Sequence, residues 1–241
     1  MHYSEKTVVP AIMCDTEANL SPLGILQMDE DILTRFFGCY GIDNVSVRDK
    51  FDSMWVFTKN TIRIGTTIQW NKPVYAESVI YKVAPFGAQA DVCMRDEAGN
   101  VAVYSRVEAC VVNLSSKRIV RPSAIGMTKE DMEAPDWVTD LPVYRMQDKD
   151  FVTEEKRIVR ATNLDMSHHT NNIEYLRFVL DTLPSAKTVT SGISEIQIEY
   201  LGQSYEGEEL ELMRSTTDPC NRQIVCGDRM IARCRIVPKA E

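Results

Sequence analysis

The chain has 241 residues, of which 44% are hydrophobic and 26% are charged, a composition that is ordinary for a globular protein. Its net charge of −8 argues against nucleic acid as a partner, because phosphate groups bind to basic surfaces. No apolar run approaches the roughly 20 residues of a membrane-spanning helix, and the first residues lack the basic and apolar regions of a secretory signal. We therefore expect a cytoplasmic protein that does not enter the membrane.

The seven cysteines and three histidines show no spacing that is typical of a metal site. The cysteines are scattered along the chain, several of them lie in strand-like apolar runs, and no CxxC pair occurs. We expect free thiols in a reducing compartment, and we expect neither a metal ion nor a cofactor.

The first half begins with a strand-like run over residues 7–13. Ser21 followed by Pro22 is a typical helix start, with an N-cap and a proline at the first helical position. The apolar spacing that follows predicts one long helix that ends near Gly38 or Gly41. Its apolar face consists of Ile25, Met28, Ile32, Leu33 and Phe36. After this helix the pattern predicts only strands, over 51–70, 73–84 and 87–114, with a hairpin turn at 98–100.

The second half repeats this order. A strand is predicted over residues 154–162, and a helix follows, for which Asn171 with Glu174 forms a capping-box-like start and Pro184 marks the end. The apolar positions of this helix are Ile173, Leu176, Val179, Leu180 and Leu183. Strands are then predicted over residues 192–201, 207–216 and 222–237, the last with a turn at its CGD sequence.

A strand, a long apolar helix and a run of antiparallel strands, all occurring twice, are typical of an internal repeat. A helix that is apolar over much of its surface must be covered, and a curved antiparallel sheet can cover it, so we expect an α+β fold. The segment between the halves carries a mixed-charge run and three prolines, and it is typical of a surface linker. The prolines are Pro122, Pro135 and Pro142. We expect a first unit over 1–115, a linker over 116–148 and a second unit over 149–241.

Two of the three histidines lie side by side in the stretch NLDMSHHTNNIEY, residues 163–175. This stretch resembles the LDxNxHxNNxxY signature of the acyl-acyl-carrier-protein (acyl-ACP) thioesterases of plants and bacteria. Six residues match in register: Leu164, Asp165, His169, Asn171, Asn172 and Tyr175. Residues 21–32 and 68–79 are similar to the first helix and the following strands of this family. The resemblance covers residues 1–113 and 151–237.

The resemblance implies a tandem hotdog fold, in which two antiparallel sheets are each wrapped around a long central helix and the two sheets are joined. It also implies an activity, hydrolysis of the thioester between a fatty acyl chain and ACP. This reaction releases free fatty acid and ends fatty acid synthesis, and it makes fatty acyl-ACP the partner of the chain.

The residue types in the motif suit this chemistry, which needs an activated water, a donor for the developing oxyanion and a dry tunnel for the chain. His169 can act as a base or orient water, and Asp165 on the preceding loop can reach the histidine or the water. Backbone N–H groups at the helix start are unpaired and can bind the thioester oxygen. Asn171 and Asn172 are candidates for substrate binding, with helix capping and loop fixation as the alternatives.

The chain departs from the family pattern at two candidate catalytic positions. Ser167 stands where the family usually has asparagine, and Gln203 stands where it has glutamate. Serine can still donate a hydrogen bond, but glutamine cannot take a proton, so Asp165 and His169 would carry the proton transfers here. Ser204 replaces a cysteine of the plant members and could be a nucleophile only with a base in hydrogen-bond reach.

The resemblance places the acyl chain largely within the first half, where Met28, Trp55 and Trp70 are candidates for its pocket and plain core packing is the alternative. The carrier protein and this chain are both acidic, so docking requires a local basic patch. Four residues that flank the motif are the candidates for this patch: Lys156, Arg157, Arg160 and Arg177.

Three alternatives stay open at this point. The chain could act on acyl-CoA, it could bind acyl groups without hydrolysing them, as Ser167 and Gln203 would allow, or it could be a hotdog dehydratase. The sequence does not set the length of the acyl chain, and it is compatible with a monomer or a homodimer.

Overall fold

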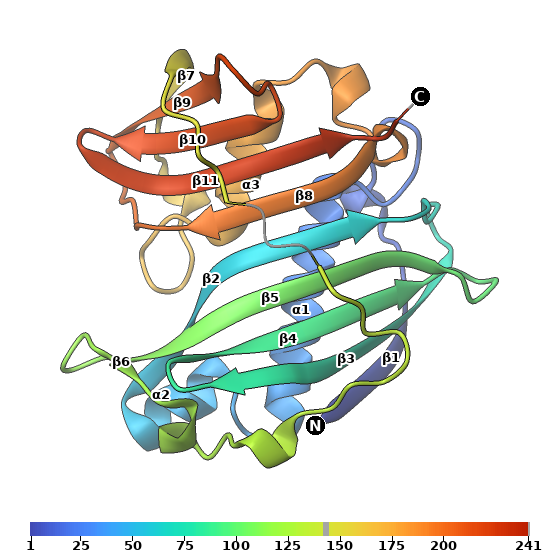
Figure 1. Ribbon diagram of the computed structural model, residues 1–241, viewed down its shortest axis with the longest axis vertical. Coiled ribbons are helices and arrows are strands. Elements are labelled where there is room, and N and C mark those ends of the chain that lie inside the picture. The colour runs from blue at the N-terminus through green and yellow to red at the C-terminus, as the bar shows by residue number, and fades with distance from the viewer. Residues whose placement is uncertain (142–144, 241) are drawn as a thin grey trace.

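The strands of the chain form one antiparallel sheet, seen in the computed structural model of residues 1–141 and 145–240 (Figure 1). The described strands are β1 (His2–Val8), β2 (Ser53–Ile64), β3 (Pro73–Ala84), β4 (Gly87–Arg95), β5 (Val101–Asn113), β6 (Ile119–Val120), β7 (Phe151–Ile158), β8 (Ile193–Tyr200), β9 (Glu209–Ser215), β10 (Asn221–Cys226) and β11 (Arg229–Pro238). The predicted hairpin turn at 98–100 connects β4 to β5, and the CGD turn connects β10 to β11.

The order of the strands confirms the internal repeat. The sheet runs β1-β3-β4-β5-β2 through the first half and continues as β8-β11-β10-β9-β7 through the second, while β6 pairs with β5. The expected joining of the two sheets occurs through β2 and β8, which pair antiparallel, with Asn60 opposite Ile198, and make one continuous sheet. Each of these strands would otherwise be an open edge of its half, and pairing satisfies the backbone groups of both.

Three α-helices are described: α1 (Pro22–Cys39), α2 (Asn44–Phe51) and α3 (Asn172–Asp181). Helices α1 and α3 are the two predicted ones, and their predicted N-caps are confirmed, since Ser21 and Asn171 each accept a hydrogen bond from a first-turn N–H. Helix α2 was not predicted. It is short and buries only Val47. Its N-cap is Asp43, whose carboxylate accepts hydrogen bonds from two first-turn N–H groups.

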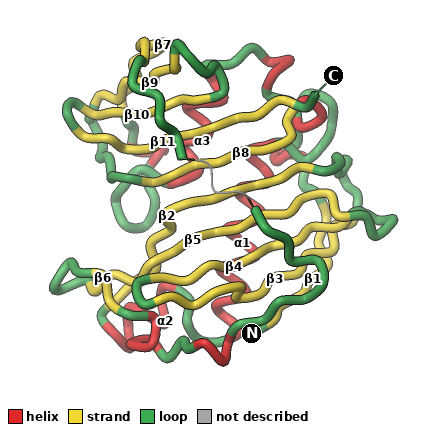
Figure 2. Tube along the Cα trace, viewed as in Figure 1, coloured by secondary structure: helices red, strands yellow, loops and turns green. Residues whose placement is uncertain are grey.

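Both long helices lie on the same side of the sheet (Figures 1 and 2). Helix α1 lies behind β3, β4 and β5 and contacts α3, which lies behind β11. Apolar side chains of both helices pack against the inner face of the sheet and make one core across the two halves. The largest fully buried side chains include Tyr175, Phe36 and Phe178. No helix in the described part of the chain is long and apolar enough to cross a membrane.

The segment between the halves covers the other face of the first half. The N–H of Glu133 donates to the carbonyl of Ile80, and the hydroxyl of Tyr104 donates to the carbonyl of Thr139. This segment is therefore a packed strap, although it carries the expected prolines. Pro142 lies outside the described residues. A buried ion pair between Arg106 and Asp91, with two 2.7 Å hydrogen bonds, lies on the strand face beneath the strap.

Candidate active site

The motif occupies the loop between β7 and α3, and the first half contains a second copy of this loop between β1 and α1. In each copy one backbone bridge closes the loop, and the residue four positions after its start has a positive φ. The bridges join Cys14 to Leu20 and Leu164 to Thr170, and the φ angles are 59° at Ala18 and 62° at His168. The repeat predicted for the strands and helices therefore extends to this loop.

Asp15 and Asp165 occupy equivalent positions in the two copies. Each donates its N–H to the carbonyl four residues later, at 2.8 Å to Asn19 and 2.9 Å to His169. Each carboxylate accepts a hydrogen bond from the N–H two residues later, in the Asx-turn pattern. The donors are Glu17 at 2.9 Å and Ser167 at 2.7 Å. Because the same bonds recur in both halves, the shape of the loop does not depend on the histidines.

The two copies differ in what they leave accessible. The second carboxyl oxygen of Asp15 accepts from the N–H of Thr190 at 2.9 Å, whereas that of Asp165 has no hydrogen-bond partner among the described residues. Asn19 is buried, but His169, its counterpart, is partly exposed. No hydrogen bond between the side chains of Asp165 and His169 is present in the described structure. The second copy therefore leaves a carboxyl oxygen and an imidazole free to act on a ligand.

The helix starts differ in the same way. In α3 the N-cap Asn171 accepts from the N–H of Ile173 at 2.9 Å, and the N–H of Asn172 makes no hydrogen bond within the described residues. The equivalent of Asn172 in α1 is Pro22, which has no N–H to offer. Only the second half thus presents a donor at the helix N-terminus, where the partial positive charge favours an anionic oxygen.

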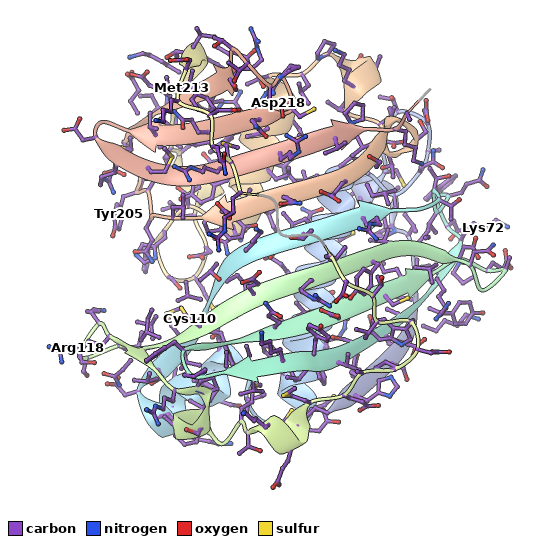
Figure 3. The ribbon with its side chains drawn as sticks, in the orientation of Figure 1. Lys72, Cys110, Arg118, Tyr205, Met213 and Asp218 are labelled. Atoms are coloured by element: carbon purple, nitrogen blue, oxygen red, sulfur yellow. The ribbon has the colours of Figure 1, made fainter. Side chains whose placement is uncertain are left out.

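Gln203 reaches the motif through Tyr205, which the sequence did not single out. The rings of His169 and Tyr205 meet edge to face with centroids 5.1 Å apart, and the hydroxyl of Tyr205 donates to Oε1 of Gln203 at 3.5 Å. Gln203 is exposed, and its carbonyl accepts from Arg229. Figure 3 shows Tyr205 in the loop between β8 and β9, at one side of the molecule. Tyr205 therefore contacts both His169 and Gln203, and His169 shares the motif loop with Asp165.

Ser204 has a structural position. It is fully buried, and its hydroxyl lies 2.7 Å from that of Thr170 and 3.0 Å from that of Tyr175. Its carbonyl also accepts from the N–H of Thr170. No base among the described residues hydrogen-bonds the hydroxyl, so the structure shows no activation of Ser204 as a nucleophile. It instead joins the motif loop, α3 and the loop after β8 through one hydrogen-bonded group.

Comparisons with known proteins point to one family. The model described as "Acyl-ACP thioesterase C-terminal domain" matches residues 146–233. Three solved structures share the fold. They are an acyl-ACP thioesterase from Bacteroides thetaiotaomicron (14% identity, TM-score 0.87), a putative oleoyl thioesterase from Lactobacillus plantarum (17%, 0.79) and a 12:0-ACP thioesterase from Umbellularia californica (17%, 0.78). Each alignment covers 99% of this chain and 98% of the other. No curated protein sequence matches the chain.

The resemblance to the acyl-ACP thioesterase family is confirmed. At these identities the solved structures establish the fold, which is hotdog-like, and the family model covers the part of the chain that holds the motif. We call residues 146–233 the matched region. It contains Asp165, His169, Asn172 and Gln203, so all the groups gathered around the loop belong to the matched region.

The residues expected to line an acyl pocket lie outside the matched region, and they differ in burial. Met28 and Trp55 are buried, and the indole N–H of Trp55 donates to the carbonyl of Ile42 at 2.9 Å. Trp70 is 56% exposed in a turn, so its expected place in an interior pocket is corrected. A surface hollow of about 320 Å³ is lined by Tyr75 and residues 95–99 and contains no residue of the motif.

Three of the four basic residues that flank the motif are engaged in ion pairs. Arg157 pairs with two acids, Lys156 pairs with two others, and Arg177 pairs with Glu174 within α3. Arg160 is exposed and makes no ion pair among the described residues. Three of the four positive charges expected for carrier docking are therefore neutralised within the chain. Arg160 carries the fourth.

Proposed function

We propose that the chain is a hydrolase of fatty acyl-ACP thioesters that releases free fatty acid and so ends fatty acid synthesis. The observation that carries this proposal is the pair of loop copies. The copy inside the matched region differs from its twin in offering together an imidazole, a helix N–H and a carboxyl oxygen that has no hydrogen-bond partner among the described residues. These are the groups that thioester hydrolysis requires.

In this mechanism the thioester carbonyl lies at the N-terminus of α3, and its oxygen accepts a hydrogen bond from the N–H of Asn172. A fixed donor of this kind stabilises the charge that develops on the oxygen in the transition state. His169 orients or deprotonates the attacking water, and Asp165 holds that water or the imidazole. The edge of the Tyr205 ring limits the rotation of His169, and Ser204 keeps the loop in place from beneath.

The two halves have different tasks in this proposal. Residues 1–115 form a first hotdog unit that holds the acyl chain, with Met28 and Trp55 in or near its path, and residues 149–241 form a second hotdog unit that carries the motif. Residues 116–148 connect them. This double hotdog arrangement would place a central helix, α1 or α3, under each half of the sheet. The continuous core beneath the sheet supports it.

The partner in this proposal is fatty acyl-ACP in the cytoplasm, and the enzyme uses no metal ion or cofactor. It is active as a monomer or a homodimer. Asn171 acts as the cap that orients the start of α3, Asn172 binds the substrate through its backbone, and Ser167 contributes through its place in the turn around Asp165. Docking relies on the surface around Lys156, Arg157, Arg160 and Arg177, with Arg160 as the available cation.

The test is release of free fatty acid from acyl-ACPs of C8 to C18 by the wild-type chain, His169→Ala and Gln203→Glu. Hydrolysis that His169→Ala lowers by about 100-fold or more would support the proposal, since general acid–base groups contribute roughly 10² to 10⁴. Hydrolysis that is insensitive to His169 would contradict it. The same panel with acyl-CoA separates the two carriers.

A second function has one observation in its favour. Gln203 cannot accept a proton, and its side chain is exposed and bound to Tyr205, as in a site that has lost its base. A protein that binds acyl groups without hydrolysing them would show acyl-ACP binding with turnover at background. If Gln203→Glu then restored hydrolysis, this second function would replace the first.

A further inference from the structure

The buried polar atoms that lack a partner gather in one place. Within the described residues, every buried side-chain nitrogen or oxygen without a hydrogen bond belongs to one of five residues: Asp29, Glu30, Asn60, Ser105 and Tyr200. A buried polar group without a partner costs roughly 1 to 3 kcal/mol, so such groups are rare and require an explanation. Their concentration around α1 indicates a site and not scattered imperfections of packing.

The register of the sheet shows that three of these residues share its inner face. Asn60 on β2 lies opposite Ile198 on β8, and Tyr200 is two residues further along β8. On the other side, Ser105 on β5 lies opposite Ile62, which is two residues from Asn60. Alternate residues of a strand point to the same face, so Ser105, Asn60 and Tyr200 form a polar stripe across three strands.

Helix α1 lies over this stripe and adds two carboxyl groups. Asp29 is fully buried, with neither oxygen hydrogen-bonded, and burial raises its pKa to about 7. Oε1 of Glu30 is also buried without a partner, and burial, with further contributions from the carboxylates of Asp29 and Asp165, raises the pKa of Glu30 to about 8. Two adjacent carboxyl groups thus lie inside the protein with no cation among the groups that shift their pKa values.

Glu30 is the member of the cluster that meets the motif. Glu30 lies on α1, which contacts α3, the helix that follows the motif loop. The carboxylate of Asp165 is among the charges that raise the pKa of Glu30, and Glu30 contributes to the raised pKa of the Tyr200 hydroxyl. The ring of Tyr200 lies 6.4 Å from that of Tyr175, which is hydrogen-bonded to Ser204 beneath the loop. The cluster is therefore continuous with the candidate active site, and Glu30 joins a helix of the first half to the loop of the second.

We propose that Glu30 is a catalytic residue of the thioester hydrolysis, supplied by the first half to complete the site of Asp165 and His169. This inference rests on the proposed function. It explains how a chain with glutamine at position 203 retains a carboxyl group for proton transfer. It also gives a role to the second carboxyl oxygen of Asp165, which accepts no hydrogen bond from the described residues, since a water between Asp165 and Glu30 would donate to it.

Glu30 takes up one proton in this step and later returns it. The water oxygen bonds to the thioester carbon, and one water proton passes to the ionised carboxylate of Glu30. The tetrahedral intermediate then expels the carrier sulfur as the carbon–sulfur bond breaks. The carboxyl of Glu30 returns its proton to that sulfur, so the products are a fatty acid and the carrier thiol, and Glu30 is again ionised. The backbone N–H of Asn172 binds the carbonyl oxygen throughout.

The groups around Glu30 set the pH at which it can act. They are Asp29 on its own helix, Asp165 in the motif loop and Tyr200 on β8, all of them acidic or neutral. Ionisation of Glu30 is disfavoured by burial and by both carboxylates, so the base form becomes abundant only as the pH rises toward 8. Asp29 is close enough to Glu30 that the two carboxyls titrate as a coupled pair.

The experiment measures kcat and KM for acyl-ACP from pH 6 to 9 with the wild-type chain, Glu30→Gln, Glu30→Asp and Asp31→Asn. Asp31 neighbours Glu30 in sequence but is an exposed partner of Arg35, so it is the matched control. We expect Glu30→Gln to lower kcat by about 100-fold or more with KM unchanged and to abolish the rise of activity with pH. Glu30→Asp should restore part of the rate, and Asp31→Asn should match the wild type.

Hydrolysis by Glu30→Gln within threefold of the wild type, with the same pH profile, would overturn this inference and leave the proposed function standing. Loss of hydrolysis in the wild type itself would overturn both. Thermal melts identify variants that fail to fold. If Glu30→Gln does not fold, Asp29→Asn is the alternative test. The carboxylate of Asp29 raises the pKa of Glu30, so its removal must shift the rise of activity with pH to lower pH if ionisation of Glu30 causes that rise. An unmoved limb would exclude Glu30.

Discussion

Asp15 and Asp165 hold the same position in two copies of one loop, yet only Asp15 uses both carboxyl oxygens to bind backbone N–H groups. We expect Asp15→Ala to lower the unfolding free energy by about 1 to 3 kcal/mol, since it leaves the partly buried N–H groups of Asn19 and Thr190 unpaired. Asp165→Ala should cost less stability but should lower kcat about 100-fold or more. Chemical denaturation and acyl-ACP hydrolysis measure the two effects. Equal losses of stability with no difference in activity would contradict the assignment of the two roles.

The start of α3 offers a substitution that removes the backbone N–H, with a control that removes only the side chain. Asn172→Pro deletes the N–H proposed to bind the thioester oxygen, while Pro22 shows that the same loop accepts proline at this position. The extended backbone of Asn171 suits a residue before proline. We expect a folded protein whose kcat falls by about 10² to 10³, the effect of a lost oxyanion donor. Asn172→Ala keeps the N–H and should stay near wild-type activity. If both variants were equally active, the oxyanion would have to bind elsewhere.

The pKa of Asp29 predicts how stability depends on pH. Its folded-state value is about 7 against an ordinary 3.8, so the folded protein binds more protons than the unfolded chain between these pH values. The unfolding free energy therefore falls as the pH rises through this window. We expect Asp29→Asn to exceed the wild type in stability by up to about 4 kcal/mol at pH 8 and to match it near pH 4. Urea melts at the two pH values measure this difference, and a gap independent of pH would exclude burial of a titrating Asp29.

We expect carrier docking to depend more on Arg160 than on the neighbouring basic residues. Arg160 makes no ion pair in the described structure, whereas Arg157 pairs with Glu155 and Asp181. We expect Arg160→Glu to raise KM for acyl-ACP about fivefold to tenfold at low salt, because a surface charge acts mainly on association. KM for a small acyl thioester should not change. An unchanged KM for acyl-ACP would remove Arg160 from the docking surface.

The sequence predicted those features of the fold that depend on neighbouring residues. Helix caps at Ser21 and Asn171, the hairpin turns and the repeat were correct, because side chains within a few positions determine them. Helix α2 was missed because it buries a single apolar residue and has no stripe to detect. The joining of the two halves through β2 and β8 depends on residues about 140 positions apart, and no local pattern reports it.

The candidate site was predictable to a similar degree. The motif identified Asp165 and His169, but Tyr205 and Glu30 approach it from a loop and a helix that only the folded chain brings near. The repeat of the loop could have been noticed from the spacing of Asp15, Asn19 and Ser21, which matches that of Asp165, His169 and Asn171. Trp70 was misplaced because an aromatic residue in a turn can be exposed despite its size.

The pairing of β2 with β8 affects how the protein unfolds and how its fragments behave. Backbone hydrogen bonds run without a break from β1 to β7, so neither half can open without exposing a long strand edge of the other. Heat or denaturant should melt the protein in one cooperative transition, with amide protons of β2 and β8 among the last to exchange. A fragment that ends before residue 116 would leave β2 as an unpaired edge strand. We expect such fragments to associate with one another through this edge.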